Sequence, residues 1–201
     1  MIKTVIFDIG GVIVDFSNDD DYYPYLSKVS GASVRRIKKV IEGRLWWKID
    51  KDEICQKEFD RIVSRKLGIE EKQVLWYESY RRAGKVDGKV IRVVRRLSKN
   101  YKMAYLSNVD LSRYSYTLKL MRPYADLFDR EFASCYIHLR KPSKAIYEYV
   151  LAKMNAKAGE TVFIDNQEDN VAGARRAGLK AILFKNSEDL EKKLKGLGVR
   201  F

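Results

Sequence analysis

The stretch Lys3-Thr-Val-Ile-Phe-Asp8-Ile-Gly-Gly11 decides the fold class of this 201-residue chain. Residues 3–7, which end in the apolar run Val-Ile-Phe, predict a short buried strand. Asp8 and the two glycines then form a turn where the backbone can approach a ligand closely. Two more apolar runs, at residues 102–108 and 161–165, also end in polar side chains. The sequence therefore predicts several buried strands that each deliver a polar residue at the carboxyl end.

Helical periodicity fills the segments between and after these strands. Helices are predicted over residues 88–98, 143–154 and 169–177, and a further strand over 180–184. Strands that alternate with helices are typical of an α/β protein with a doubly wound parallel sheet. Ligands of such a sheet bind beyond the carboxyl ends of its strands. The polar residues expected at those ends are Asp8, Ser107, Asn108 and Asp165.

The segment that follows the first strand has helical rather than alternating periodicity. Apolar residues fall on one face of a helix predicted over residues 33–42. Asp50 and Glu53 have the spacing of a capping box, which predicts a helix that starts there and ends at Gly68. A third helix is predicted over about 70–82. Three predicted helices in a row indicate that this segment is a helical insertion after the first strand.

These patterns divide the chain into two parts. We predict a core domain formed by residues 1–15 and 85–201, and a helical insertion formed by residues 16–84. At this length, and with 46% hydrophobic residues, one domain with an insert can bury a proper core. No internal repeat or low-complexity linker interrupts the pattern, so a single catalytic unit is the economical interpretation.

Composition excludes several classes of protein and site. No apolar run approaches the roughly 20 residues needed to cross a bilayer, and no leader pattern precedes the first strand, so we expect no membrane partner and a cytoplasmic location. His138 is the only histidine, which excludes a histidine-based triad or a multi-histidine metal site within one chain. Cys55 and Cys135 lie in unrelated contexts and are expected to be free thiols.

The chain carries 40 basic and 27 acidic residues, a formal net charge of +13. The basic runs coincide with segments of helical periodicity, so we interpret them as solvated helix faces. Their field would also attract a small anionic substrate such as a phosphorylated metabolite. No nucleic-acid-binding motif accompanies the charge, so a nucleic-acid partner is not expected. The sequence leaves the oligomeric state open.

Four segments carry a resemblance to a known family. They are Phe7-Asp8-Ile-Gly-Gly-Val-Ile-Val-Asp15, Leu106-Ser107-Asn108, Arg140-Lys141-Pro142 and Val162-Phe-Ile-Asp165-Asn166-Gln-Glu-Asp169-Asn170. In this order they resemble the four motifs of the haloacid dehalogenase superfamily of hydrolases. The match spans nearly the whole chain. It implies a Rossmann-like α/β core with a small helical cap inserted after the first strand.

The resemblance assigns roles that agree with the chemistry of the residues. Asp8 would attack a phosphoryl or carbon centre and form a covalent aspartyl intermediate, although an Asp after a strand can also cap a turn. Ser107 and Asn108 would face the developing negative charge, and both residue types also favour a helix N-cap. Further residues predicted to line the substrate site are Gly10, Gly11, Trp46 and Trp47. The two tryptophans could equally be part of the cap core.

Lys141 and a magnesium ion complete the predicted site. Lys141 would neutralise the phosphoryl group and Asp8, and its place before Pro142 suits the first turn of a helix. The expected cofactor is Mg²⁺, a hard cation that prefers oxygen ligands. Its predicted ligands are Asp8, the carbonyl of Gly10, Asp165, Asn166 and Asp169. Asp169 could instead cap its own helix.

Two positions depart from the pattern of the family's phosphatases. Gly10 stands where these enzymes usually carry a second aspartate, which acts as general acid and base. Loss of such a group lowers the rate by roughly 10² to 10⁴. Asn166 stands where an acidic residue usually binds the metal, and an amide brings no charge. The spacing from Asn166 to Asp169 also resembles that of the metal-free haloacid dehalogenases, whose halide leaving group needs no proton.

Three functions remain compatible with these residues. The first is a Mg²⁺-dependent phosphomonoesterase acting on a small phosphorylated metabolite through an aspartyl-phosphate intermediate. The second is a metal-independent 2-haloacid dehalogenase, with Trp46, Trp47, Trp76 and the cap tyrosines as an apolar pocket. The third is a non-catalytic or very slow binding or regulatory protein that keeps the fold. The first explains best why four motif positions are present together.

Overall fold

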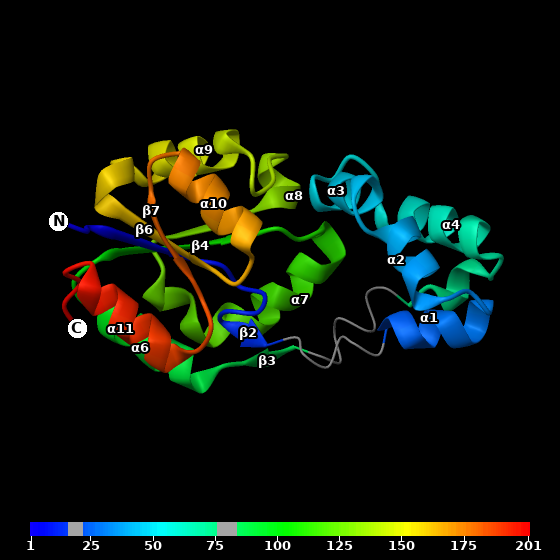
Figure 1. The fold of residues 1–201 in the computed structure, drawn as a ribbon, viewed down its shortest axis with the longest axis horizontal. Coiled ribbons are helices and arrows are strands. Elements are labelled where there is room, and N and C mark those ends of the chain that lie inside the picture. Colours follow the sequence, from blue (N-terminus) through cyan, green and yellow to red (C-terminus); the bar gives the residue numbers. More distant parts are fainter. Residues whose placement is uncertain (16–21, 76–83) are drawn as a thin grey trace.

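The computed structural model describes residues 1–15, 22–75 and 84–201. Its main sheet has five strands in the order β5-β4-β1-β6-β7 (Figure 1), and every neighbouring pair is parallel. The strands are β1 (Thr4–Phe7), β4 (Lys102–Ser107), β5 (Arg130–Ala133), β6 (Thr161–Asp165) and β7 (Lys180–Leu183). The chain builds outward from β1 first on one side and then on the other. The strand order therefore reverses at β1, where a doubly wound sheet opens a ligand crevice.

Helices cover both faces of the sheet because successive side chains of each strand point to opposite faces. Val5 and Phe7 belong to one core cluster and Ile6 to the other. The helices over the first face are α6 (Gly88–Leu97), α7 (Leu111–Met121) and α11 (Ser187–Gly196), and those over the second are α9 (Lys144–Met154) and α10 (Glu168–Arg176). This layering confirms the predicted α/β fold with a doubly wound parallel sheet.

A helical cluster lies beside the sheet domain in Figure 1, and we call its described residues 22–75 the helical insert. It contains α1 (Tyr22–Ser30), α2 (Val34–Ile41), α3 (Arg44–Asp50), α4 (Gln56–Leu67) and a 3₁₀ turn (Glu71–Gln73). Its helices pack around a core of their own, which includes Leu26, Ile37 and Phe59. A short antiparallel pair, β2 (Val14–Asp15) with β3 (Lys85–Val86), lies where the chain leaves and re-enters the sheet domain. The division predicted at residues 15/16 and 84/85 stays a prediction.

Most predicted elements agree with the structure to within one or two residues. The strands β1, β4, β6 and β7 and the helices α2, α6, α9 and α10 all lie at predicted positions. Sequence periodicity missed the helices α1, α3 and α7 and the edge strand β5. Of the helix predicted over 70–82, the described part contains only the 3₁₀ turn Glu71–Gln73. Residues 76–83, which include Trp76, lie outside the described ranges.

The predicted capping box of Asp50 and Glu53 is wrong. Asp50 is the last residue of α3, and α4 begins only at Gln56, after Cys55. The Asp50 side chain is bound by two arginines of the sheet domain instead. A long-range ion pair has therefore replaced the local hydrogen bonds that the spacing suggested.

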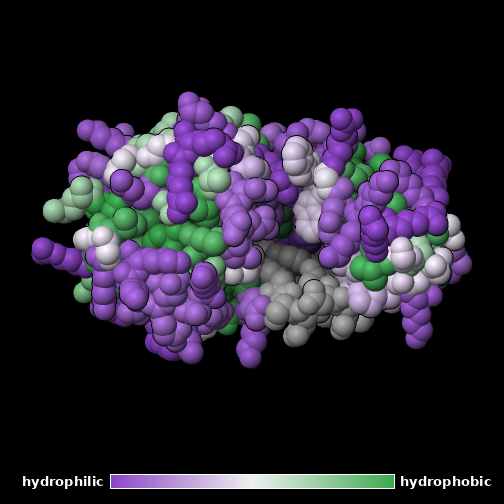
Figure 2. All heavy atoms as spheres, viewed as in Figure 1, coloured by the Kyte–Doolittle hydropathy of each residue, from purple (hydrophilic) through white to green (hydrophobic). Residues whose placement is uncertain are grey.

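The basic runs lie on exposed helix surfaces, as expected. Figure 2 shows hydrophilic side chains over most of this face, including the region of α6 and α11, and Arg92, Arg95 and Lys192 are exposed. Among the described residues, we find no helix with the length and apolar character required of a membrane span.

Candidate active site

Asp8 directly follows β1, the central strand of the sheet. Its backbone N–H donates to Ile164 O at 2.8 Å, and the N–H of Ile9 donates to Asp8 Oδ1 at 2.7 Å. The side chain is 8% exposed. Its other oxygen, Oδ2, makes no hydrogen bond with residues 1–15, 22–75 or 84–201. Asp8 thus caps its own turn with one oxygen and keeps lone pairs of the other available, so the cap does not occupy the oxygen that a nucleophilic attack would use.

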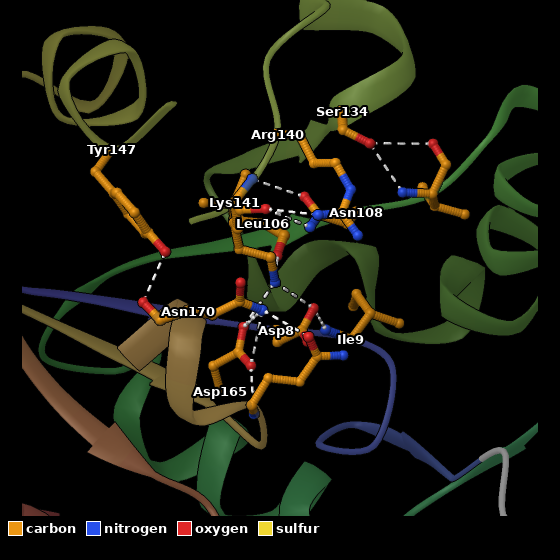
Figure 3. A network of polar contacts seen from close by, with 12 residues as sticks. Asp8, Ile9, Leu106, Asn108, Ser134, Arg140, Lys141, Tyr147, Asp165 and Asn170 are labelled. Carbon is orange, nitrogen blue, oxygen red and sulfur yellow. Dashed lines mark hydrogen bonds and ion pairs between the residues drawn. The ribbon is translucent and has the colours of Figure 1, made fainter. Parts of the chain in front are cut away.

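Lys141 links the ends of three neighbouring strands. Its ammonium Nζ lies 2.8 Å from Asp8 Oδ1 and 2.8 Å from Asp165 Oδ2, and it donates to Leu106 O at 2.9 Å (Figure 3). The side chain is 1% exposed. An ammonium has three N–H donors, so these acceptors use all of them. We call Asp8, Lys141 and Asp165 the site cluster, and its formal charge is −1.

Burial has opposite effects on the acid and the base of the site cluster. It raises the pKa of Asp8 from 3.8 to about 7, and Asp165 adds to this while Lys141 opposes it. Burial lowers the pKa of Lys141, but the neighbouring carboxylates outweigh that effect and hold the pKa above its usual value. The carboxylates therefore favour the charged form of Lys141, whereas burial makes Asp8 easier to protonate than an exposed carboxyl.

Ser107 and Asn108 do not cap a helix, since α7 has Asp110 as its N-cap. The amide of Asn108 holds the backbone of Lys141 from both sides: Lys141 N donates to Asn108 Oδ1 at 3.0 Å, and Asn108 Nδ2 donates to Lys141 O at 3.0 Å. The Ser107 hydroxyl makes no hydrogen bond within the described residues, and Ser107 lines a cavity that Asp8 also lines. Asn108 thus positions the lysine, whereas Ser107 is available to a ligand.

Asp165 ends β6 and is completely buried. Besides Lys141, its oxygens accept from Gln167 N at 2.8 Å and from Asn170 Nδ2 at 3.0 and 3.2 Å. Asn170 itself is 3% exposed and lies next to Asp165 in Figure 3. The carboxylate therefore serves mainly to hold Lys141 and the turn into α10.

A cavity of about 450 Å³ opens over the site cluster. It brings together most of the residues predicted to act on substrate: Asp8, Gly10, Gly11, Trp46, Ser107, Asn108, Lys141 and Asn166. Asp15, whose role the sequence left open, lines it as well. The remaining walls come from residues to which the sequence assigned no role in the site, namely Asp50, Val109, Arg113, Arg140, Gln167 and Asn170.

Gly11 is required where the turn after β1 meets Asn166. Its φ is +73°, and a Cβ built there would lie 2.2 Å from Asn166 Nδ2. Because glycine alone tolerates both the positive φ and the contact, the Asn166 side chain can lie directly over the turn. Gly11 therefore lets the turn and Asn166 pack closely where both line the cavity.

Three predicted placements need correction. Asp169 is exposed on α10 and is not among the cavity-lining residues, since the helix turns Asn170 inward instead. Trp47 is 51% exposed and does not line the cavity, although its ring covers the Arg140 guanidinium at 5.4 Å. Lys141 does not lie in a first helical turn, because α9 begins only at Lys144, after its N-cap Ser143.

A second ion cluster joins the helical insert to the sheet domain at the same cavity. Asp50, which is completely buried, accepts from Arg113 Nη2 at 2.9 Å and from Arg140 Nε at 3.0 Å, and Arg113 Nε also pairs with Asp110. We call Asp50, Asp110, Arg113 and Arg140 the seam cluster. Its formal charges sum to zero. The only sequence signal for it was that Arg140 neighbours Lys141 in a motif.

The end of α3 is anchored to the sheet domain by its backbone as well. The hydroxyl of Ser134 donates to Asp50 O at 2.6 Å, and His138 Nδ1 lies 2.8 Å from Lys51 O. The last carbonyls of a helix have no partner inside the helix. Side chains from the sheet domain satisfy two of them here, which fixes the helical insert over the cavity.

The donors around the cavity suit a hard cation rather than a soft one. Within the described ranges there is no group of three His, Cys, Asp or Glu side chains that could hold a metal. Of the predicted ligands, Asp8, Gly10 and Asn166 line the cavity and offer a carboxylate, a carbonyl and an amide oxygen, whereas Asp165 is completely buried and does not line it. Mg²⁺ is commonly held by one or two carboxylates together with substrate phosphate and water. This donor set therefore fits Mg²⁺ when a phosphate shares the site.

Curated proteins similar to this chain include two phosphatases. It is 23% identical to a D-ribitol-5-phosphate phosphatase of Bacteroides thetaiotaomicron, over 96% of this chain and 97% of that protein. It is 24% identical to a sesquiterpene phosphatase of Aspergillus oryzae, over 92% and 91%. A drimenol cyclase of Aspergillus calidoustus is 22% identical over 96% of this chain, which spans only 36% of that longer protein.

Solved structures share the fold. A HAD family enzyme of Bacteroides thetaiotaomicron superimposes with a TM-score of 0.79 at 20% identity, covering 96% of this chain and 98% of that one. A structure of such an enzyme in complex with magnesium and inorganic phosphate gives a TM-score of 0.72 at 21% identity, covering 92% and 95%. The family model of haloacid dehalogenase-like hydrolases matches residues 2–178. The chain therefore belongs to the haloacid dehalogenase-like hydrolases.

Proposed function

We propose that this hydrolase is a Mg²⁺-dependent phosphomonoesterase that acts on a small phosphorylated metabolite. One observation carries the proposal: Lys141 holds Asp8 by Oδ1 at 2.8 Å, while Oδ2 has no partner in the described chain and faces a polar cavity. A buried carboxylate oriented by a cation and open on one side is suited to nucleophilic attack. Both phosphatase relatives and the magnesium and phosphate complex of a neighbour agree with this chemistry.

The proposed reaction has two steps. Asp8 attacks phosphorus, its new bond to phosphorus forms while the ester P–O bond breaks, and the leaving alcohol takes a proton from water. Water then attacks phosphorus of the aspartyl phosphate and gives a proton to the hydroxide left by the first step, while the acyl C–O–P bond to Asp8 breaks at phosphorus, which releases hydrogen phosphate and restores the Asp8 carboxylate. Lys141, whose three N–H donors already have acceptors, would act on the phosphoryl oxygens through its charge, and the Ser107 hydroxyl would donate to them. Asp8, the Gly10 carbonyl and Asn166 would hold Mg²⁺, which would supply positive charge at those oxygens.

The absence of an acid at Gly10 predicts which substrates react fastest. A leaving group that departs without a proton should be hydrolysed well, while an alkyl leaving group should be slow. Hydrolysis of p-nitrophenyl phosphate in Mg²⁺ that stops with EDTA and in Asp8→Asn protein would support the proposal. Gly10→Asp should then accelerate alkyl esters by about 10²-fold or more, because it restores a general acid. No turnover of any phosphate ester in a broad panel would refute the proposal.

The third candidate, a binding protein without turnover, has one observation in its favour. Every Asp165 oxygen is already hydrogen-bonded, so a metal must displace one of those bonds. This candidate predicts that phosphate raises the melting temperature while Gly10→Asp still gives no hydrolysis. The dehalogenase alternative expects an apolar pocket, whereas charged and amide side chains make up most of the cavity wall. It is tested by halide release from chloroacetate without metal.

A further inference from the structure

The guanidinium of Arg140 is held from three directions. Its Nε donates to Asp50 Oδ2 at 3.0 Å, and its Nη1 donates to Lys141 O at 3.0 Å. The ring of Trp47 lies 5.4 Å from its Cζ. The side chain is nevertheless 19% exposed. Arg140 is therefore a cation with a fixed orientation that solvent or a ligand can still reach.

One nitrogen of this guanidinium has no protein partner in the described parts of the chain. Arg140 Nη2 donates no hydrogen bond there, and Arg140 lines the same cavity as Asp8 and Ser107. Figure 3 shows the Arg140 side chain beside Asn108, with Lys141 between Arg140 and Asp165. Nη2 carries two of the five N–H donors of arginine. These donors can bind an oxygen of a substrate whose phosphoryl group is at Asp8.

The charge of this wall indicates which kind of oxygen it binds. Asp50 and Asp110 balance Arg113 and Arg140, so the seam cluster presents hydrogen-bond donors without net positive charge. A second anion on the substrate would gain little Coulomb energy there. A hydroxyl group gains the hydrogen bond and brings no charge to desolvate. The wall is thus suited to a hydroxylated leaving group.

We propose that Arg140 is a specificity-determining residue that donates a hydrogen bond to a hydroxyl oxygen of the leaving group. Asp50, from the helical insert, is the positioning residue that orients this guanidinium. Docking of the helical insert then completes the part of the site that recognises the leaving group. This inference rests on the proposed phosphoester hydrolysis and names the substrate class for the same cavity.

The experiment compares two esters with the same three-carbon chain, propyl phosphate and glycerol 3-phosphate. Wild-type protein with Mg²⁺ should have a higher kcat/KM for the glycerol ester. In Arg140→Gln, the ratio of the two kcat/KM values should fall by about 10-fold, since one charge-assisted hydrogen bond is lost. Arg95→Gln, an exposed arginine on α6, is the matched control and should keep the ratio.

Asp50 is tested by the same ratio, because a general loss of stability lowers both kcat/KM values together. Asp50→Asn should reduce the ratio as Arg140→Gln does, and the double variant should reduce it no further. Asp50→Glu, which keeps the charge, should restore part of it. If Asp50→Asn does not fold, Trp47→Ala removes another support of Arg140 and should lower the ratio by a smaller factor.

The outcomes separate this inference from the proposed function. An unchanged ratio in Arg140→Gln, or a wild-type protein that hydrolyses both esters equally, would overturn the role of Arg140 and leave phosphoester hydrolysis standing. A fall in the ratio that Asp50→Asn does not share would overturn the role of Asp50. Hydrolysis of neither ester nor of p-nitrophenyl phosphate would overturn both proposals.

Discussion

Two buried ion clusters meet at one cavity, and they differ in charge and in origin. The site cluster has one lysine between two aspartates, and all three come from the strand ends and loops of the sheet domain. The seam cluster has two arginines and two aspartates, and one of these, Asp50, comes from the helical insert. The first carries a formal charge of −1 and the second is neutral.

The difference shows what each cluster contributes. A buried cluster with uncompensated negative charge costs stability. In the site cluster, the uncompensated charge includes the Asp8 oxygen Oδ2, which has no partner among the described residues and could react with a substrate. A balanced cluster contributes docking and orientation, because each carboxylate oxygen of Asp50 already has a guanidinium partner. The first cluster is therefore expected to govern chemistry, and the second the stability and the fit of the insert.

The largest effect is expected on activity, from Asp8→Asn. An amide cannot form the aspartyl phosphate, so kcat for p-nitrophenyl phosphate should fall by at least about 10⁴-fold. Asp169→Asn is the matched control, since Asp169 is an exposed aspartate near the same motif. It should change kcat less than about 3-fold. Comparable losses of kcat in the two variants would show that Asp169 acts in the reaction and would contradict its position outside the cavity.

The next effect concerns stability, and Lys141→Met measures it. The substitution leaves Asp8 and Asp165 buried without their shared cation, which should cost about 3–5 kcal/mol of the free energy of unfolding at pH 8. Urea denaturation measures the loss. Lys144→Met, an exposed lysine paired only with Glu148, should leave the free energy nearly unchanged. Equal effects of the two substitutions would show that Lys141 is not the cation of a buried cluster.

A smaller loss is expected at the seam, from Asp50→Ala. Two arginines lose a partner, but Arg113 keeps Asp110 and Arg140 is partly exposed. The free energy of unfolding should fall by about 2–3 kcal/mol, less than for Lys141→Met. Limited proteolysis should show earlier cleavage in the helical insert than in the sheet domain. A larger loss than that of Lys141→Met would reverse the proposed division of roles between the clusters.

The smallest effect has a distinctive pH dependence. The folded-state pKa of Asp8, about 7, lies above the ordinary value of 3.8, so the carboxyl favours the folded state while protonated and loses that contribution as the pH rises through 7. Asp8→Asn mimics the neutral carboxyl. Without Mg²⁺ it should therefore be more stable than wild type by about 1–3 kcal/mol at pH 8. The difference should shrink towards pH 4, and a constant difference would contradict the burial effect.

The sequence could place two members of the site cluster, Asp8 and Asp165, at one edge of the sheet because each lies at the carboxyl end of a strand. Strands of a parallel sheet end at one edge, so Asp8, Ser107 and Asp165 had to converge once the fold class was known. Lys141 could be placed only through the family resemblance. The shift from Asp169 to Asn170 shows the limit of such reasoning, since one residue is a rotation of about 100° around a helix.

The seam cluster could not be predicted in the same way. It depends on how a separate helical unit packs on the sheet domain, and no spacing in the sequence relates Asp50 to Arg113 or Arg140. The local signal even pointed elsewhere, because Asp50 and Glu53 fit a capping box. The specificity inferred for Arg140 therefore required the packed structure, whereas the nucleophile did not.

The most direct measurement is mass spectrometry of protein quenched in acid during turnover of p-nitrophenyl phosphate with Mg²⁺. Acid preserves an acyl phosphate long enough for peptide analysis. We expect a phosphoryl group on the peptide that contains Asp8, fragmentation that places it on that residue, and none in Asp8→Asn protein. Continued hydrolysis with no phosphoryl group on Asp8, or with the group on another residue, would contradict Asp8 as the nucleophile.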